Sequence, residues 1–362
     1  MKVLYIGNYK DGTGWANACC GNILAMDAAG IEVVPRAITF EKQSKPYPKR
    51  IKELEIKYSK KSDNYDCDVV VQHTLPHLYS YNSRYKNIGF FDTESFDFAT
   101  TGWQHYANMM DEIWVPSEQN LQAAKTSGIT VPIKIIPHSI DMSEYENTDG
   151  AKIQEMQNNF TFGFVGEFIE RKNLKALIKA FHMEFDPREP VNLFIKTSKS
   201  SLEDVQKFCG HIRRGLKLRK EYKEEIVVAG MLEKVDYASV LSQVDCFVMP
   251  SRGEAFCIPA LEAMALGIPS IYTESIGMDY CVGEAVPARV EPCFGAMQTL
   301  PDLDTASSTW AEIDVLELCK AMRKWYNNKD LSSSIKEECI ETAAEYDHKY
   351  IGIGIKEILN GG

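Results

Sequence analysis

The chain has 362 residues, 44% of them hydrophobic and 25% charged, which is enough to bury the cores of two globular domains. The net charge of −11 argues against a general nucleic-acid-binding surface. The ten cysteines include no pair at CxxC spacing, and no apolar stretch reaches membrane-spanning length. We therefore expect a cytoplasmic protein with reduced thiols and no metal site.

Short apolar runs alternate with helical patterns through the first part of the chain. The run at residues 2–7 leads into a glycine-containing turn ending at Gly14, where the backbone can approach a ligand before a helix over 16–29. A plain tight turn is the alternative for the same glycines. Further strand-like runs follow at 31–38, 67–72, 87–91, 112–116 and 133–137. The alternation predicts a parallel sheet with helices on both faces, in a domain over residues 1–145.

Three ionisable side chains stand directly after these runs. His73 follows 67–72, and Asp92 and Glu94 follow 87–91. Because the carboxyl ends of parallel strands meet at one edge of a sheet, we expect these residues to form one ligand-facing rim. A strand-end carboxylate is as often a helix cap, so each residue by itself is a weak indication.

Two segments are locally basic. Glu41 to Lys61 carries eight Lys and Arg against three Glu, and Lys207 to Lys223 is also rich in basic residues. The favoured interpretation is two solvated helix faces. The alternative is docking to an anionic acceptor or peripheral contact with the inner face of a membrane.

A polar segment over 142–159 marks a domain boundary, after which a second alternating series begins. Strands are predicted at 160–165, 191–196 and 226–229, with a loop over 166–173 before a helix at 174–185. The series predicts a second domain over 146–340. Trp310 to Tyr326 is predicted as an amphipathic helix, and Glu338 to Leu359 as the closing helical stretch.

The stretch Val244 to Ile271 predicts a strand, a loop, a helix and a strand, with Glu254 and Glu262 eight positions apart. Carboxylates at the carboxyl end of a strand suit hydrogen bonds from sugar or ribose hydroxyls. The start of the helix directs backbone N–H groups at an anion such as phosphate. Those N–H groups belong to Ala255, Phe256, Cys257 and Ile258.

This stretch resembles the E-x7-E signature of the retaining nucleotide-sugar glycosyltransferases of family 4, the group 1 transferases. Residues that match around the two glutamates are Ser251, Gly253, Phe256, Pro259, Ala263, Ala265, Gly267 and Pro269. In the first half, residues 111–117 (DEIWVPS) and 136–141 (IPHSID) are also similar to the family, although His138 and Ser139 depart from the usual IPNGVD. The resemblance implies the GT-B fold: two doubly wound Rossmann-like α/β domains facing across a cleft, with residues 341–362 packing back toward the first domain.

The resemblance also implies roles for the donor-binding residues. Glu254 would contact hydroxyls of the donor sugar, and Glu262 the ribose. Gly166 and Lys172 match the family's diphosphate-binding loop, but Glu167 stands where an arginine is usual. Arg171 or Lys196 is expected to replace that charge, and the loop containing Met231 and Leu232 is expected to bracket the base. Asp92 falls near a histidine that supports catalysis in several relatives, so His73, Asp92 and Glu94 are expected to share that role with Glu254.

The prediction is a metal-independent, retaining hexosyltransferase. It takes a nucleoside diphosphate sugar as co-substrate, a UDP-sugar before a GDP- or ADP-sugar, and needs no further cofactor. The acceptor is a hydroxyl on a saccharide or lipid-linked glycan, with a nucleic-acid base or another polyanion as a lesser alternative. A binding or partner subunit without turnover is the alternative from another class, and a GT-B epimerase or phosphorylase ranks below it. The sequence does not predict the oligomeric state.

Overall fold

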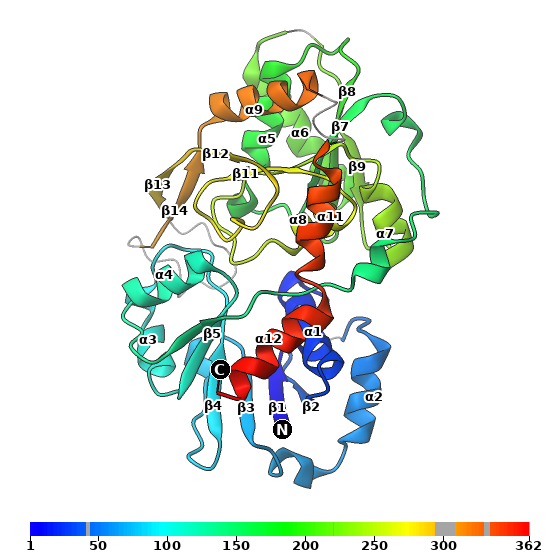
Figure 1. Ribbon diagram of the computed structural model, residues 1–362. Helices are drawn as coiled ribbons and strands as arrows, with labels where there is room; N and C mark the ends of the chain where they lie inside the picture. Colours follow the sequence, from blue (N-terminus) through cyan, green and yellow to red (C-terminus); the bar gives the residue numbers. More distant parts are fainter. Residues whose placement is uncertain (41–43, 220, 294–307, 329–333, 362) are drawn as a thin grey trace. The chain divides into compact units, whose positions relative to one another are not determined.

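The computed structural model describes residues 1–40, 44–219, 221–293, 308–328 and 334–361 (Figure 1). The chain divides into two compact units. The first unit comprises Met1–Asp141 and Glu345–Gly362, and the second comprises Met142–Ala344. Each unit is built on a six-stranded parallel sheet covered by helices (Figure 1), which confirms the predicted fold class of two doubly wound α/β domains.

The sheet of the first unit has the strand order β2-β1-β3-β4-β5-β6. Its strands are β1 (Lys2–Gly7), β2 (Glu32–Ala37), β3 (Val69–His73), β4 (Lys86–Phe90), β5 (Glu112–Val115) and β6 (Ile133–Ile135). The register pairs Gly7 with His73 and His73 with Phe90, so three neighbouring strands end at the same level. The strand order reverses between β1 and β3, and doubly wound sheets bind ligands beyond the carboxyl ends of strands at such a point.

Helices α1 (Gly14–Ala28), α2 (Lys49–Lys57), α3 (Trp103–Ala107), α4 (Glu118–Thr126) and α12 (His348–Leu359) complete the first unit. The side chain of Thr13 caps α1 by accepting a hydrogen bond from the Ala16 N–H. Helix α12 packs on α1 (Figure 1), and a Cβ at Gly352 would lie only 1.9 Å from the carbonyl oxygen of Ala25. Gly352 therefore allows the close approach of the two helices.

The sheet of the second unit has the strand order β12-β11-β10-β7-β8-β9. Its strands are β7 (Phe160–Val165), β8 (Val191–Thr197), β9 (Ile226–Ala229), β10 (Cys246–Met249), β11 (Ser270–Thr273) and β12 (Gly283–Val286). Read from β9, this is the 3-2-1-4-5-6 order of the dinucleotide-binding fold, with the reversal between β7 and β10. The surrounding helices are α5 (Leu174–Glu184), α6 (Leu202–Leu216), α7 (Lys234–Leu241), α8 (Ile258–Ala265), α9 (Val315–Asn327) and α11 (Lys336–Ala344).

One helix prediction near the end of the chain is wrong at its start, and the closing helical stretch is present with a break. Residues Thr309–Ile313 form strand β14, which pairs in antiparallel fashion with β13 (Ala288–Pro292), and α9 begins only after the Asp314 cap. The closing stretch Glu338 to Leu359 contains two helices, α11 and α12, which belong to different units. The break follows from Asp347, whose carboxylate accepts a hydrogen bond from the Lys349 N–H and starts a new helix.

Candidate functional site

The loops after β7 and β10 bring one carboxylate and two cations together in the second unit. Lys172, at the end of the short 3-10 helix Glu170–Lys172, donates hydrogen bonds to both carboxylate oxygens of Glu254, at 2.8 and 3.0 Å. Arg171 lies 3.1 Å from Glu254 Oε1 and donates to the carbonyl oxygen of Gly253 at 2.6 Å. The cluster stands where the strand order reverses, the position at which a doubly wound sheet binds its ligand.

Glu254 is ionised in this setting. Its side chain is 5% exposed, and burial alone would raise its pKa, but the charges of Lys172 and Arg171 outweigh burial and lower the pKa below its ordinary value. The site therefore holds two cations against one carboxylate, with Lys172 and Arg171 each about one-eighth exposed. A net positive charge with access to solvent is what a diphosphate requires.

Glu262 lies on α8 and is held by two tyrosines. Its Oε1 accepts a hydrogen bond from Tyr145 Oη at 2.7 Å, and its Oε2 accepts one from Tyr237 Oη at 2.6 Å. Lys234 adds a cation 3.6 Å from Oε1. Burial, followed by the charge of Glu262, raises the pKa of both tyrosines, so they remain hydrogen-bond donors. Each carboxylate oxygen has a second lone pair, which leaves Glu262 able to accept a further hydroxyl.

Lys196 is not part of the cluster around Glu254. It is 3% exposed, and its ammonium group donates to the carbonyl oxygens of Thr197 at 2.9 Å and Gly230 at 2.6 Å. Lys196 thus links the ends of β8 and β9. Glu167, at the position where an arginine was expected, accepts hydrogen bonds from the Thr197 hydroxyl and the Lys199 N–H. Of the two cations considered as replacements for that arginine, the structure brings Arg171 to Glu254.

The remaining donor-side candidates are spread over three segments. Gly166 follows β7, where a Cβ would lie 3.6 Å from Lys172 Cδ. Met231, which follows β9, is 72% exposed, and Leu232 is half-buried. The segment Ala255–Ile258 is buried at the start of α8, and Phe256 stacks on Tyr280 with ring centroids 4.5 Å apart.

His73 and Asp92 meet at the carboxyl edge of the first sheet. His73 is fully buried and stacks on Phe90, with its Nδ1 2.6 Å from Tyr5 Oη and its Nε2 3.9 Å from Asp92 Oδ1. Burial lowers the pKa of His73, which favours the neutral ring. Glu94 lies two residues beyond Asp92 in the same loop and is half-buried.

His138 is a third member of this cluster, and the sequence noted it only as a departure from a family motif. Its Nε2 lies 3.3 Å from Asp92 Oδ2, and its Nδ1 lies 3.4 Å from Asn22 Nδ2. Burial would raise the pKa of Asp92, but the charge and hydrogen bond of His138, together with the nearby ring of His73, hold that pKa well below its ordinary value. The position of His138 just after β6, at the same edge as His73 and Asp92, is the signal that could have revealed it.

Polar atoms without partners gather at this edge. Most buried polar atoms in proteins are hydrogen-bonded, so a local group of unpaired ones indicates water or a polar ligand. At Gly14, where α1 begins, a Cβ would meet no heavy atom within 4 Å, which leaves the edge open at that point. Among the buried side-chain atoms that lack a hydrogen-bond partner within the described residues, those in this region are Asn8 Oδ1, Asp11 Oδ1, Trp15 Nε1, Asn22 Oδ1, His73 Nε2, Thr74 Oγ1 and Asp92 Oδ1.

Comparison with known proteins finds a family model that matches part of the chain. Residues 146–296 match the model of the glycosyl transferases group 1, and this range contains Lys172, Glu254 and Glu262. The second unit of the chain is therefore similar to the group 1 glycosyl transferases over the matched residues. The chain is 26% identical over 172 residues to the uncharacterized glycosyltransferase YqgM of Bacillus subtilis, covering 47% of this chain and 44% of YqgM. It is 28% identical over 119 residues to the serotype-specific mannosyltransferase WbdA of Escherichia coli, covering 31% of this chain and 13% of WbdA. The matches span less than half the length of these curated relatives.

Solved structures show that the chain has the GT-B fold. HepE of Anabaena, determined in complex with UDP-glucose, aligns over the whole of both chains with a TM-score of 0.67 and 15% identity. WaaG, a glycosyltransferase of lipopolysaccharide biosynthesis, also aligns over both whole chains, with a TM-score of 0.64 and 13% identity. Sucrose-phosphate synthase from Thermosynechococcus elongatus aligns over 99% of this chain and 98% of its own, with a TM-score of 0.66 and 13% identity. At these identities the likeness concerns the fold alone.

Three further features of the chain bear on its setting. Within the described residues, no three His, Cys, Asp or Glu side chains are arranged to hold a metal ion. Among the helices that the structure describes, none is long and apolar enough to cross a membrane. All ten cysteines are free thiols, and nine of them are buried.

Proposed function

We propose that this protein moves a hexose from a nucleoside diphosphate sugar to a hydroxyl acceptor, with retention of anomeric configuration. The observation that carries the proposal is the cluster of Lys172, Arg171 and Glu254 at the point of strand reversal. Two of the similar proteins support the donor class: one structure holds UDP-glucose, and one relative is named a mannosyltransferase. A UDP-sugar is the first choice, before a GDP- or ADP-sugar.

The proposed reaction breaks the bond between the anomeric carbon and the diphosphate oxygen, and forms a bond from that carbon to the acceptor oxygen. The acceptor hydroxyl releases its proton, which ends on the departing diphosphate. Negative charge grows on the diphosphate as it leaves. Lys172 and Arg171 stabilise that charge with fixed cations, the role that a divalent ion has in other architectures. The proposed reaction is therefore metal-independent.

The carboxylates orient the donor in this proposal. Glu254 accepts hydrogen bonds from hydroxyls of the donor sugar through lone pairs that Lys172 and Arg171 do not use. Glu262, held in place by Tyr145 and Tyr237, accepts the ribose hydroxyls. Met231 and Leu232 flank the base. Gly166 leaves room beside Lys172 for a phosphate, because a side chain there would approach the lysine stem.

The first unit supplies the acceptor contacts in this proposal. Asp92 is ionised and accepts a hydrogen bond from the attacking hydroxyl, while His138 holds its second oxygen. His73 fixes the position of Asp92 from the other side, and Glu94 lies within the same loop. The acceptor is a saccharide or a lipid-linked glycan, and a nucleic acid is the lesser alternative. We place the reaction in the cytoplasm, where the ten free thiols stay reduced.

The test is donor turnover with a panel of UDP-, GDP- and ADP-hexoses. We expect one donor to bind and to be hydrolysed slowly in the absence of acceptor, and NMR of the released sugar to show the donor's own anomer first. Glu254→Gln should abolish turnover. If none of the nucleotide sugars binds or is hydrolysed, the transferase proposal fails. A partner subunit without turnover would instead retain its binding partner in the Glu254→Gln variant.

A further inference from the structure

A hollow of about 450 Å³ opens at the carboxyl end of edge strand β2 in the first unit. Pro35, Arg36 and Ala37 form one wall, and Lys10, which follows β1, lies beside it. The size is in the range of small-ligand sites. The hollow lies beside the last residues of β2, and the connection between α2 and β3 supplies Ser59, Lys60, Lys61 and Asn64 on its other side.

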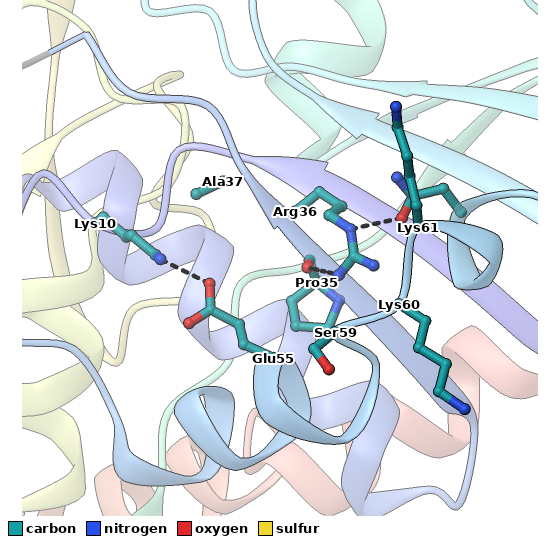
Figure 2. A pocket seen from close by; sticks show the side chains of 9 residues that line it. Lys10, Pro35, Arg36, Ala37, Glu55, Ser59, Lys60 and Lys61 are labelled. Atoms are coloured by element: carbon teal, nitrogen blue, oxygen red, sulfur yellow. Dashed lines mark hydrogen bonds and ion pairs between the residues drawn. The ribbon is translucent and has the colours of Figure 1, made fainter.

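The lining of this hollow is strongly basic in an acidic chain. Lys10, Arg36, Lys60 and Lys61 face one carboxylate, Glu55, which gives four positive charges against one and a net of three. In Figure 2, Arg36 lies between Lys10 and Glu55 on one side and Lys60 and Lys61 on the other. The whole chain carries a net charge of −11, so the positive charge of this lining is opposite in sign to the net charge of the chain.

Glu55 does not neutralise the rest of the lining, because its oxygens are already used. Lys10 Nζ lies 2.7 Å from Glu55 Oε1, which also accepts a hydrogen bond from Tyr9 Oη at 2.8 Å. Tyr47 Oη donates to Glu55 Oε2 at 2.7 Å. These contacts make a closed local network of one lysine, one glutamate and two tyrosines.

Arg36 is half-buried and is held by neutral oxygens. Its Nε donates to Asn64 Oδ1 at 2.6 Å, one Nη donates to the Pro35 carbonyl at 2.8 Å (Figure 2), and the other Nη donates to the Tyr58 carbonyl at 2.7 Å. These bonds fix the plane of the guanidinium group and use three of its five N–H donors. Within the described part of the chain, no carboxylate forms an ion pair with Arg36, Lys60 or Lys61.

A fixed guanidinium group with two free donors, flanked by two long flexible ammonium groups, is suited to a tetrahedral oxyanion. We propose that this hollow binds a phosphate group carried by the acceptor. The binding of phosphate follows from the hollow alone, whereas its place on the acceptor rests on the proposed function. Three unneutralised positive charges favour a doubly charged phosphate over a single carboxylate.

Several basic residues of the segment Glu41 to Lys61 do not line the hollow. Residues 41–43 of this segment lie outside the described residues. On α2, Arg50 pairs with Asp27 at 2.7 Å, and the ammonium group of Lys52 lies 5.0 Å from the centre of the Tyr47 ring. Neither residue lines the hollow. Lys49 is 90% exposed and also lies outside the hollow. Lys49→Ala removes one positive charge, as each of the two lysine substitutions in the hollow does, and it therefore serves as the control.

The test is a titration with inorganic phosphate and with glucose 6-phosphate, followed by NMR of the arginine Nε–H signals at constant ionic strength. The Arg36 signal is assigned by its loss in Arg36→Lys. We expect that signal to shift to saturation, and the double variant Lys60→Ala/Lys61→Ala to raise the Kd about threefold or more. Lys49→Ala should leave the Kd within about twofold. An Arg36 signal that does not saturate, or an equal loss in the double variant and in Lys49→Ala, would overturn the proposal.

Two further arms give the source of the phosphate and separate this proposal from the proposed function. If glucose 6-phosphate saturates the Arg36 signal at a lower concentration than inorganic phosphate does, the acceptor is a phosphorylated sugar. If vesicles of anionic phospholipid do so instead, it is a lipid headgroup, and either result supports the phosphate site. Donor hydrolysis should be unchanged in Lys60→Ala/Lys61→Ala. Failure of every nucleotide sugar to bind would remove the acceptor role, while the phosphate titration would still decide whether the hollow is an anion site.

Discussion

Replacing Lys172 with Met should lower both the stability of the second unit and the rate at which the donor is hydrolysed. Lys172 makes two charge-assisted hydrogen bonds, at 2.8 and 3.0 Å, to the buried carboxylate of Glu254. Removing one partner of a buried ion pair costs about 3–5 kcal/mol when the other charge is left alone. Arg171 remains 3.1 Å from Glu254, so we expect the smaller loss of about 1–2 kcal/mol that follows from charged hydrogen bonds.

That loss corresponds to a fall of about 2–8 °C in Tm for a domain of this size. The same substitution removes a cation that we assign to the departing diphosphate, so kcat/KM for the donor should fall about 100- to 1,000-fold. Thermal unfolding by circular dichroism measures the first effect, and donor hydrolysis measures the second. Lys175→Met, at an exposed position on α5, is the matched control and should change neither quantity.

The two effects can be separated by a double-mutant cycle. Glu254→Gln in the Lys172→Met background should cost less stability than Glu254→Gln in the wild type, because the cation that it would leave unpaired is already absent. The assignment of Lys172 to the diphosphate is refuted if Lys172→Met is less stable but binds and hydrolyses the donor as the wild type does. In that case the lysine would only neutralise Glu254.

Three further predictions concern pH and the partners of the carboxylates. The folded-state pKa of Glu254 is lowered from an unfolded value near 4.5, so its contribution to stability is complete above about pH 4.5 and is lost as the pH falls. The difference in the free energy of unfolding between the wild type and Glu254→Gln should therefore shrink below that pH. Acid titrations followed by circular dichroism measure this difference. Tyr237→Phe removes the 2.6 Å hydrogen bond to Glu262 and should raise the donor Kd about 2- to 12-fold in calorimetry, whereas an unchanged Kd would argue against ribose binding by this carboxylate. His138→Asn removes the contact at 3.3 Å to Asp92 and should lower kcat about tenfold while leaving the donor Kd unchanged; a changed donor Kd with normal kcat would contradict an acceptor-side role.

The sequence predicted the fold well where local patterns decide the structure. The stretch Val244 to Ile271 contains strand β10, helix α8 and strand β11 as expected, because a buried β run, a proline in the first helical turn and a terminating glycine are local signals. The prediction for Trp310 to Tyr326 was wrong at its start, since the pairing of β14 with β13 is not visible in the helix pattern. Strand pairing depends on a partner elsewhere in the chain.

The same distinction applies to the candidate site. Lys172 and Glu254 are 82 positions apart, and a family resemblance was needed to place them together. The sequence around Tyr145 does not indicate that its hydroxyl contacts a carboxylate, and that carboxylate, Glu262, is 117 positions away. His138 could have been suspected from its place after a strand, but its partner Asp92 is set by the order of the strands in the sheet. Contacts of this range follow from topology, which a single sequence specifies only indirectly.

The most direct test of the proposed donor site is a crystal structure with a nucleoside diphosphate bound. The nucleotide used should be the one released from the donor that the protein hydrolyses. We predict that the diphosphate contacts Lys172 and Arg171 and that the ribose hydroxyls contact Glu262. The base should lie against the loop of Met231 and Leu232. A nucleotide bound elsewhere, or one whose diphosphate lies away from Lys172 and Arg171 while Glu254 keeps both cations, would contradict the proposed donor site.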